Sequence, residues 1–579
     1  MSKRTHRKRS TERHRLVLGA LLLLLAAIVV RVGYLQIHMA PAYAERAETQ
    51  RTRELELAPK RGSILDRSGD PLAVSIEART VYATPRLVQD ATSTAEALSS
   101  VLGGDSSDYA ERLQRDSGFV YIGRKVDMER AGALESLKLS GIGMLKDSRR
   151  TYPCGELASQ LLGFVGIDDE GLAGLEKHYD HVLRGEAGYV LAERDPFGRV
   201  LPGGVVHAEE PVHGHDVVLT IDKDIQYAAQ LHLQAAVDTW QAKSASIVVM
   251  DPRSGEVYAI ASVPGFNPNN YGDSDEASRR NRAITDVYEP GSTVKSLTAA
   301  AVIDAGLHGP DDVFTLPPTI SVGGRTIKEA HPRPTAEWTL GEIVMNSSNV
   351  GTVLLGQALG PERLYEYFSR FGLTERTGID FPGEALGYLP PVDQWSGSSI
   401  GNIPFGQGVS MTPLQLARAM CAIANGGYLP SPHFILGVPQ REDIEFSWPV
   451  ERAISEEAAA ATRDIMVASV TDGTGGAAAV PGYAVAGKTG TAQKARTDGR
   501  GYAQGAYISS FAGFLPAEDP QLLIVVTVDE PKGAIYGGVV AAPVFREVAS
   551  FAVAHLKIPP SSVRESSVIE TVTPDPGGE

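Results

Sequence analysis

The sequence predicts an α+β protein with one N-terminal transmembrane helix, a mixed α/β region and a larger domain built on an antiparallel sheet flanked by helices. Residues 16–37 form an apolar run that is long enough to cross a bilayer. Residues 38–215 mix short apolar runs with glycines and charges, which favours small strands and helices joined by tight turns. Residues 216–557 have strand patterns at both ends and an Ala-rich helical stretch between them, which predicts the sheet with helices on its faces.

The N-terminal segment sets the predicted topology. Residues 1–15 carry seven Lys or Arg and one acidic residue, and the apolar run at 16–37 follows. Twenty-two helical residues span about 33 Å. The positive-inside rule therefore places residues 1–15 in the cytoplasm and residues 38–579 outside. A cleaved signal peptide is the alternative, with Ala42-Tyr43-Ala44 as its cleavage site, but the long run and Pro41 favour an uncleaved anchor.

The composition excludes several classes of function. The net charge is −16, and residues 1–15 contribute +6, so the remainder is strongly acidic and a nucleic-acid partner is not expected. The two cysteines, Cys154 and Cys421, are expected to be free thiols, because a chain of 579 residues needs no disulfide framework. The chain has no Cys/His cluster with zinc spacing and no H-E-x-x-H motif, so neither a metal nor a cofactor is expected.

Residues 38–215 contain three distinctive segments but no nucleophile–base pair. These segments are Arg61-Gly-Ser-Ile-Leu-Asp-Arg-Ser-Gly69, Arg149-Arg-Thr-Tyr-Pro153 and Gly171-Leu-Ala-Gly-Leu-Glu176. We interpret the region as a spacer and interaction module.

The α/β pattern becomes clearer after residue 216. Periodicity predicts strands at 217–220, 246–250, 256–262, 483–486, 507–514 and 522–528, and helices at 224–240 and 541–557. The second and third of these strands form one hairpin, and the last two form another. Residues 558–579 are rich in Pro, Ser and Glu and predict a disordered tail.

The tetrad Ser292-Thr-Val-Lys295 is the first catalytic candidate. Pro290 and Gly291 break the preceding segment, and an apolar helix is predicted over 293–305, with Gly306 after its end. Residues three apart share a face of a helix, so Lys295 can reach the hydroxyl group of Ser292. A serine becomes nucleophilic when a base takes its proton, and a lysine can be that base when its pKa is lowered. Alone, the pattern is typical of an ordinary capped helix with an exposed lysine.

Two further motifs follow in order. Ser347-Ser-Asn349 begins 55 residues after Ser292, and Lys488-Thr-Gly-Thr491 begins 141 residues after Ser347. Alone, the first is typical of a polar turn or helix cap and the second of a solvated strand. The order S-x-x-K, S-x-N, K-T-G is that of penicillin-binding proteins and serine β-lactamases.

Each motif residue has a predicted role in acyl transfer. Ser292 is the nucleophile and Lys295 its general base, while Ser347 relays protons and Asn349 orients Lys295 and a substrate amide. Lys488 supplies positive charge. The backbone N–H groups of Ser292 and Thr491 form the predicted oxyanion hole. The predicted substrate-binding residues, which take a substrate carboxylate through two hydroxyl groups, are Thr489, Gly490 and Thr491.

A nucleotide-binding interpretation competes for Lys488. Residues 482–489 match the P-loop pattern G-x-x-x-x-G-K-T, and Asp529 after the strand at 522–528 resembles a magnesium ligand. A P-loop requires a helix directly after the Lys-Thr pair, and the polar stretch 493–505 is a poor helix. An exported domain would also meet little ATP.

The quoted segments resemble the class B penicillin-binding proteins, membrane-anchored peptidoglycan D,D-transpeptidases, over nearly the whole chain. The segments around Arg61, Arg149 and Gly171 resemble motifs of that family's elongated pedestal. Asp251–Gly255, Tyr288–Lys295 and Gly408–Leu416 resemble its transpeptidase domain, which is serine β-lactamase-like in fold. The stretch from Asp529 to Phe545 is more similar to division-type (septal) and sporulation members than to elongation-type ones.

This resemblance implies five regions. They are a cytoplasmic tail (1–15), a transmembrane anchor (16–37), a pedestal of the dimerisation type (38–215), a transpeptidase domain (216–557) and a disordered tail (558–579).

The resemblance also implies a function. Ser292 would attack the penultimate D-Ala of a stem pentapeptide, release D-Ala and pass the acyl group to an amine of a neighbouring stem, and β-lactams would trap the same serine. The implied partners are peptidoglycan stem peptides or lipid II-derived glycan strands, a SEDS-family glycosyltransferase, other division proteins and the membrane, at the division septum. The alternatives are an elongation- or sporulation-type transpeptidase, a membrane-bound β-lactamase, a β-lactam-sensing receptor and a catalytically silent scaffold.

Overall fold

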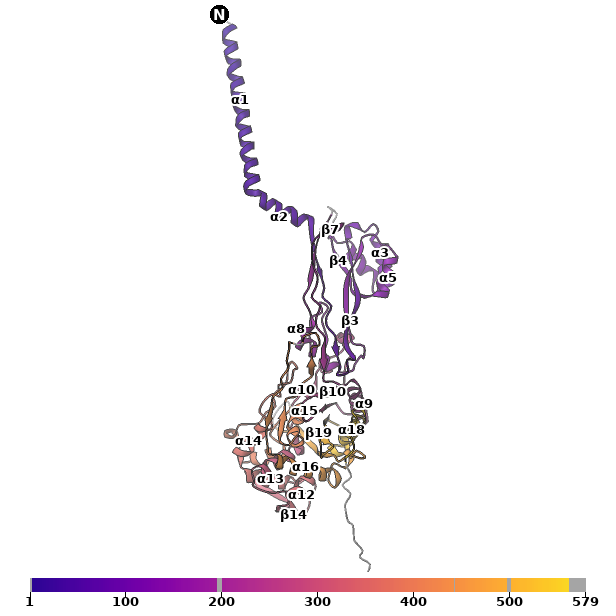
Figure 1. The fold of residues 1–579 in the computed structure, drawn as a ribbon, viewed down its shortest axis with the longest axis vertical. Helices are drawn as coiled ribbons and strands as arrows, with labels where there is room; N and C mark the ends of the chain where they lie inside the picture. The colour runs from indigo at the N-terminus through magenta and orange to yellow at the C-terminus, as the bar shows by residue number, and fades with distance from the viewer. Residues whose placement is uncertain (1–2, 195–199, 442, 497–500, 562–579) are drawn as a thin grey trace, which may run out of the picture. The chain divides into compact units, whose positions relative to one another are not determined.

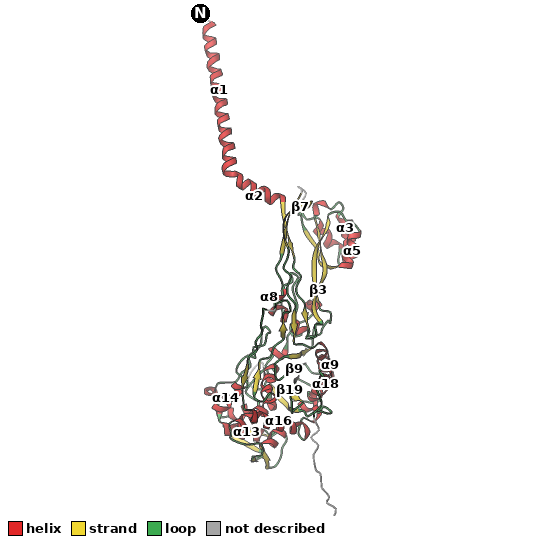
Figure 2. Cartoon of the chain, viewed as in Figure 1, coloured by secondary structure: helices red, strands yellow, loops and turns green. Residues whose placement is uncertain are grey.

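The structure is a computed structural model that describes residues 3–194, 200–441, 443–496 and 501–561. Helices and strands occur throughout these residues, which confirms the predicted α+β class (Figure 2). The chain divides into two compact units: one holds Met1–Lys60, Glu77–Arg149 and Gly185–His213, and the other holds Arg61–Ile76, Arg150–Arg184 and Gly214–Glu579. Most of the predicted tail at 558–579 lies outside the described residues.

The first unit begins with a long helix. Helix α1 (Lys3–Tyr34) continues through the π-helical segment Leu35–Met39 into α2 (Ala40–Arg51) (Figure 1). Within the described residues, Glu12–Arg46 is the one helical stretch that is long and apolar enough to cross a membrane. Its large apolar side chains are exposed on all sides, as expected for a helix that contacts lipid. This helix contains the predicted anchor at 16–37.

The rest of the first unit has two parts. One is an antiparallel sheet of β1 (Thr52–Leu57), β6 (Gly188–Arg194) and β7 (Val200–Glu209). The other is a small α/β subdomain in which the C-terminal half of β3 (Pro71–Ala83) pairs with β4 (Val120–Asp127), and β5 also pairs with β3. Its remaining elements are α3 (Ala91–Leu102), α4 (Ser106–Leu113), α5 (Met128–Ser136) and β5 (Ile142–Thr151). Asp90, Asp105 and Asp127 cap the three helices.

A buried ion network joins the three segments that the sequence singles out between residues 61 and 176. Arg61 Nε donates to Glu176 at 2.7 Å, Arg150 Nε donates to the other oxygen of Glu176 at 2.6 Å, and Arg61 also pairs with Asp180. The side chains of Arg61, Arg150 and Glu176 are at most 2% exposed. The charges compensate one another, as buried charges must. The network ties residues 61–76 and 150–184 together in the second unit.

The second unit is organised around a five-stranded antiparallel sheet. Its strand order is β10 (Val257–Val263), β9 (Ser244–Met250), β20 (Leu522–Asp529), β19 (Tyr502–Leu515) and β18 (Ala486–Ala495). Helices α9 (Lys223–Trp240) and α18 (Ala542–His555), which lie close together in Figure 1, cover one face. Helices α11 (Lys295–Asp304) and α15 (Pro413–Ala424) pack on the other face. Alternate residues of β9 and β20 enter the two cores, so both faces of these central strands are buried.

The remaining elements of the second unit surround this sheet. The helices are α6 (Ser159–Leu162), α7 (Gly174–His178), α8 (Asp180–Leu183), α10 (Arg282–Thr285), α12 (Leu340–Met345), α13 (Asn349–Leu359), α14 (Pro361–Arg370), α16 (Glu456–Thr471) and α17 (Gly537–Val540). The strands are β2 (Ile64–Leu65), β8 (Val217–Leu219), β11 (Val313–Leu316), β12 (Thr319–Val322), β13 (Arg325–Lys328), β14 (Ala336–Thr339), β15 (Tyr428–Pro430), β16 (Ile435–Gly437) and β17 (Val450–Arg452).

Two predicted elements are placed differently. The strand predicted at 483–486 begins only at Ala486 and contains the Lys488 motif instead of leading into it. The helix predicted over 293–305 begins at Lys295, because Gly291–Val294 forms a 3₁₀ turn. Gly306, with φ +64°, follows the end of this helix as predicted, in a conformation that favours glycine.

Candidate active site

Ser292 lies in the 3₁₀ turn Gly291–Val294 at the start of α11. Gly291 adopts φ +58° and donates its N–H to the carbonyl of Gly406 at 3.1 Å. Thr293 and Val294 are buried, whereas Ser292 is half-buried and lines a cavity of about 760 Å³. The turn therefore presents one hydroxyl group to the cavity and anchors its neighbours in the core.

Lys295 is fully buried and meets the second motif. Its Nζ donates to the carbonyl of Ser347 at 2.6 Å, to Ser347 Oγ at 3.3 Å and to Asn349 Oδ1 at 2.7 Å. Burial lowers the pKa of Lys295 well below its usual value, the nearby Lys488 lowers it further, and Glu329 opposes the shift. These contacts hold Lys295 beside the motif that the sequence predicts as its partner.

Local backbone geometry orients the second motif. Helix α12 ends at Met345, and Ser347 adopts φ +55°, which is unfavourable by about 1–2 kcal/mol for a residue with a side chain. Ser348 then caps α13 by accepting the N–H of Gly351 at 2.9 Å. The sharp turn between the two helices directs both oxygens of Ser347 to Lys295.

The third motif lies within β18, the edge strand of the sheet. Thr489 and Thr491 line the cavity. Thr489 Oγ1 lies 2.8 Å from the hydroxyl oxygen of Thr474, and Thr491 Oγ1 accepts the N–H of Gly537 at 3.2 Å. Because Thr491 Oγ1 already accepts a hydrogen bond from the protein, its own hydrogen remains available to a ligand.

Lys488 is as buried as Lys295. Burial lowers its pKa to about 7, and its Nζ donates to the carbonyl of Thr489 at 3.4 Å. Burial thus favours the neutral form of Lys488. A bound carboxylate would favour the protonated form.

Gly490 permits a close approach between β18 and the turn that carries Ser292. A Cβ atom at this position would lie 2.2 Å from Ser510 Oγ, 3.0 Å from Thr293 Cγ2 and 3.1 Å from the carbonyl oxygen of Pro290. A Cβ at Gly291 would similarly lie 3.4 Å from the carbonyl oxygen of Thr491. The strand that carries Thr491 and the turn that carries Ser292 therefore approach too closely for a side chain at Gly490.

One buried acid beside the second motif was not predicted from the sequence. The side chain of Glu329, which follows β13, is 6% exposed and contacts Ser348, Asn349 and Arg333. A carboxylate after a short strand is too common in sequences to be singled out. Other cavity-lining residues that the motifs do not include are His331, Thr474, Gln493, Tyr507, Tyr536 and Gly537.

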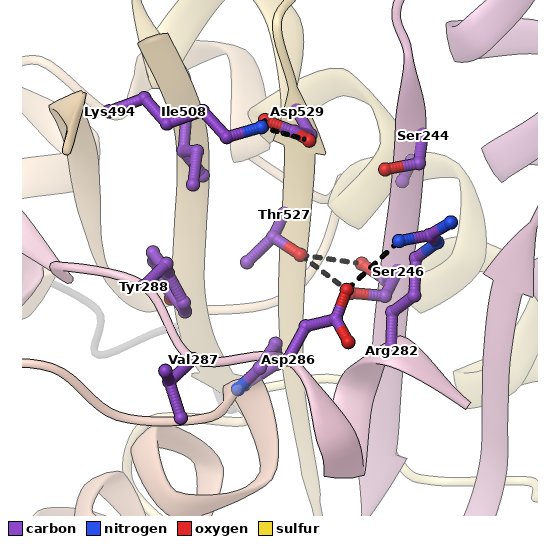
Figure 3. Close-up of a pocket in the computed structure, with 12 residues that line it drawn as sticks. Ser244, Ser246, Arg282, Asp286, Val287, Tyr288, Lys494, Ile508, Thr527 and Asp529 are labelled. Carbon is purple, nitrogen blue, oxygen red and sulfur yellow. Dashed lines mark hydrogen bonds and ion pairs between the residues drawn. The ribbon is translucent and has the colours of Figure 1, made fainter. Parts of the chain in front are cut away.

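A second, smaller cavity lies away from these residues. It has a volume of about 110 Å³, and β9, β18, β19 and β20 contribute to its wall (Figure 3). Its charged side chains already pair with each other, Lys494 with Asp529 at 2.7 Å and Arg282 with Asp286 at 2.9 Å. A space of this size holds only a few water molecules, at about 30 Å³ each. The larger cavity is therefore the candidate active site.

One described cluster has the composition of a metal site. Ligand atoms of Asp222, Asp224 and His555 lie within 4.8 Å of one another. Asp222 Oδ1 caps α9 and its Oδ2 lies 3.0 Å from His555 Nε2, so both oxygens already have partners. The cluster is explained by helix capping. Cys154 and Cys421 are free, and the first is exposed.

Two family models match the chain and together cover most of it. The penicillin-binding protein dimerisation domain matches residues 56–219, and the penicillin-binding protein transpeptidase domain matches residues 245–550. The chain is a class B penicillin-binding protein. It is therefore a serine D,D-transpeptidase, the enzyme class that the order of its three motifs predicts.

Curated relatives agree over nearly the full length. Penicillin-binding protein PbpB of Mycolicibacterium smegmatis is 36% identical, over 98% of this chain and 92% of the relative. Stage V sporulation protein D of Bacillus subtilis is 36% identical, over 94% and 85%. Peptidoglycan D,D-transpeptidase FtsI of Escherichia coli is 34% identical, over 95% and 93%.

Solved structures show the same architecture. Penicillin-binding protein 3 of Mycobacterium tuberculosis, in complex with ampicillin, matches with a TM-score of 0.69 and 33% identity, over 88% of this chain and 98% of that one. A peptidoglycan synthetase of Bifidobacterium adolescentis matches with a TM-score of 0.72 and 29% identity, over 89% and 98%.

The fold of this penicillin-binding protein also excludes the P-loop interpretation. After Lys488-Thr489 the chain continues as β18 to Ala495, where a P-loop would start a helix. Lys488 therefore lies on a strand beside the turn that carries Ser292.

Proposed function

We propose that this penicillin-binding protein cross-links peptidoglycan stem peptides during septal wall synthesis through an acyl-enzyme on Ser292. The observation that carries the proposal is the convergence of Lys295, Ser347 and Asn349 at the cavity lined by Ser292. Burial favours the neutral form of Lys295, which is the form that a general base needs.

Acylation follows from this arrangement. Neutral Lys295 takes the proton of Ser292 as Oγ bonds to the carbonyl carbon of the penultimate D-Ala. The N–H groups of Ser292 and Thr491 stabilise the oxyanion. Ser347, in contact with Lys295, passes a proton to the departing amine, and D-Ala leaves with that proton. An acceptor amine then attacks the ester, loses its proton by the reverse relay and restores Ser292.

The substrate carboxylate has a matching site. Thr489 and Thr491 offer hydroxyl groups on β18, and protonated Lys488 supplies the charge. Asn349 contacts Lys295 and lines the cavity, so it can orient both the base and a substrate amide. Gly490 serves the site by letting β18 approach the nucleophile turn.

Covalent labelling tests the acyl-enzyme. We expect a fluorescent penicillin to label the full chain in detergent, with the adduct on Ser292 by mass spectrometry. Ser292→Ala should abolish labelling, whereas Ser396→Ala, which alters an exposed serine in the same unit, should not. An unlabelled wild type would falsify the acyl-enzyme, and release of hydrolysed antibiotic within seconds would instead support the β-lactamase alternative.

The septal role is proposed from relatives, and their names point to two different roles. FtsI and PbpB relatives support a division enzyme, while the sporulation protein D of B. subtilis is equally similar. We expect depletion of the protein to give filaments and a fluorescent fusion to gather at the septum. Round cells would instead indicate an elongation enzyme, and a defect confined to spores a sporulation enzyme.

We propose that the protein spans the inner membrane once, with residues 1–15 in the cytoplasm and the catalytic domain outside. The positive charge before the apolar helix supports this orientation. Protease added to spheroplasts should digest the transpeptidase domain and leave the N-terminal tail protected. A SEDS-family glycosyltransferase and other division proteins are the proposed partners, and crosslinking in living cells followed by mass spectrometry tests them.

We retain the five predicted regions as a proposal, with the pedestal at 38–215 and the transpeptidase domain at 216–557. The matches at 56–219 and 245–550 support a boundary near residue 216. The compact units add that residues 61–76 and 150–184 pack with the catalytic half.

A further inference from the structure

Glu329 is the acid whose contacts the three motifs do not explain. Its Oε1 accepts hydrogen bonds from Ser348 Oγ at 2.6 Å and from Arg333 Nη2 at 2.7 Å, and its Oε2 accepts the backbone N–H of Asn349 at 2.7 Å. Charge-assisted hydrogen bonds of this length are strong. One carboxylate therefore binds two consecutive residues of the S-x-N segment.

These contacts fix the geometry of the second motif. Ser347 has an unfavourable positive φ and needs its neighbours to hold it. Asn349 Nδ2 donates to the carbonyl of Lys328, next to Glu329, at 2.9 Å, which leaves Asn349 Oδ1 to accept from Lys295. The segment 328–329 thus holds the backbone and the side chain of Asn349 at once.

The negative charge of Glu329 also acts on Lys295. The charged groups that act on Lys295 are Lys488 from β18, which lowers its pKa, and Glu329, which raises it. Arg333 partly neutralises Glu329 and stacks on the ring of Trp338 at 4.4 Å from its centroid. The pKa of Lys295 therefore depends on the balance between the positive charge of Lys488 and the negative charge of Glu329.

We propose that Glu329 is a positioning residue that holds Ser348 and Asn349 beside Lys295 and supplies the negative charge that opposes Lys488. This role rests on the proposed function of Lys295 as the base. Glu329 lines the cavity, but the contacts that carry this role are those with Ser348, Asn349 and Arg333.

The pH profile of penicillin acylation by the full chain in detergent tests this role. Acylation requires neutral Lys295, so its rate rises with pH through the pKa of that group. Glu329→Gln removes the negative charge, and the midpoint of this rise should move down by about one pH unit. The plateau should fall about tenfold, since an amide cannot accept from Ser348, Asn349 and Arg333 together. Glu337→Gln, which alters an exposed acid on β14, should leave both unchanged.

Two further variants exclude a merely structural effect. Arg333→Gln leaves the charge of Glu329 less neutralised, so the midpoint should move up, opposite to Glu329→Gln. Glu329→Asp keeps the charge and should restore the wild-type midpoint even if its plateau is lower. Thermal unfolding identifies any of these three variants that does not fold. The pH profiles of the variants that do fold then test the role of Glu329.

The outcomes separate the two proposals. A wild type that forms no acyl-enzyme contradicts the proposed function. The role of Glu329 alone is overturned by a second outcome. In it the wild type is acylated with a rate that rises with pH, but the midpoints of Glu329→Gln and Arg333→Gln stay in place or move in the same direction.

Discussion

Lys488 shows at the residue scale that burying a lysine lowers its pKa and costs stability. Its pKa of about 7 in the folded protein lies below the value of about 10.5 in an unfolded chain. Between these values the unfolded state binds a proton that the folded state lacks, so the free energy of unfolding rises with pH across this window.

Lys488→Met should therefore raise the melting temperature while it impairs acylation. We expect a gain of roughly 1–2 kcal/mol in stability, largest at or below pH 7 and shrinking towards pH 10. Calorimetry of the full chain in detergent at several pH values measures it. Lys177→Met, which removes an exposed lysine, is the control, and a gain independent of pH would contradict the linkage.

Gly490→Ala should distort β18 where it contacts both β19 and the nucleophile turn. The new methyl group would meet Ser510 Oγ at 2.2 Å, so we expect acylation to fall at least tenfold, of the order of 1.4 kcal/mol or more. Adding Ser510→Ala should recover part of the loss, because it removes the nearest atom. Gly437→Ala, where a Cβ meets nothing within 4 Å, is the control. Equal loss in the single and double variants would count against the clash.

Sequence reasoning predicted the residues of the site better than their surroundings. Ordered motifs with defined chemistry placed Lys295 near Ser347 and Asn349, and the structure brings them together. Glu329 could not be predicted, because its position depends on the hairpin of β12 and β13, which no motif marks. The role of Gly490 in substrate binding stays a prediction, and the structure adds that a side chain there would collide with Ser510 and approach the turn.

At the scale of elements, periodicity identified the central hairpins and the two helices on one face of the sheet. The hairpins of β9 with β10 and β19 with β20, and helices α9 and α18, lie where they were predicted. The start of β18 was misplaced because the Lys488 motif is polar. The burial of such a strand depends on tertiary contacts that a local pattern does not reveal.

The ion network of Glu176 should be essential to the elements it joins. Glu176→Gln leaves Arg61 and Arg150 buried without the charge that compensates them, and we expect a loss of about 3–5 kcal/mol. Thermal unfolding and limited proteolysis measure it. Asp116→Asn breaks the exposed pair with Arg86 and should have little effect. Equal stability of the two variants would show that the network is dispensable.

At the scale of the whole molecule, the apolar helix decides where the enzyme works. Leu22→Arg combined with Leu25→Arg places two charges in the segment at 16–37, each costing about 2.5–3.5 kcal/mol near the centre of a bilayer. We expect the variant to be lost from the membrane fraction after alkaline extraction, while detergent-solubilised protein still reacts with penicillin. Membrane retention equal to that of the wild type would contradict the anchor.

The grouping of distant segments was not predictable from the sequence. Residues 61–76 and 150–184 belong to the second unit through contacts such as Arg61 with Glu176, which are 115 residues apart. Local patterns assign these segments to the N-terminal region, because nothing in their composition indicates that they pack with residues after 214.

The position of β20 in the central sheet has a consequence for the timing of folding. Strand β20 lies between β9 and β19 and ends 279 residues after β9. At about 5–20 residues per second, roughly 15–60 seconds of synthesis separate them. During that time the apolar strand β9 pairs with β10 but its other edge, which β20 later covers, stays unpaired, a state prone to aggregation. Slow export would lengthen this delay, so we expect the nascent chain to depend on a holding chaperone until its last strands emerge.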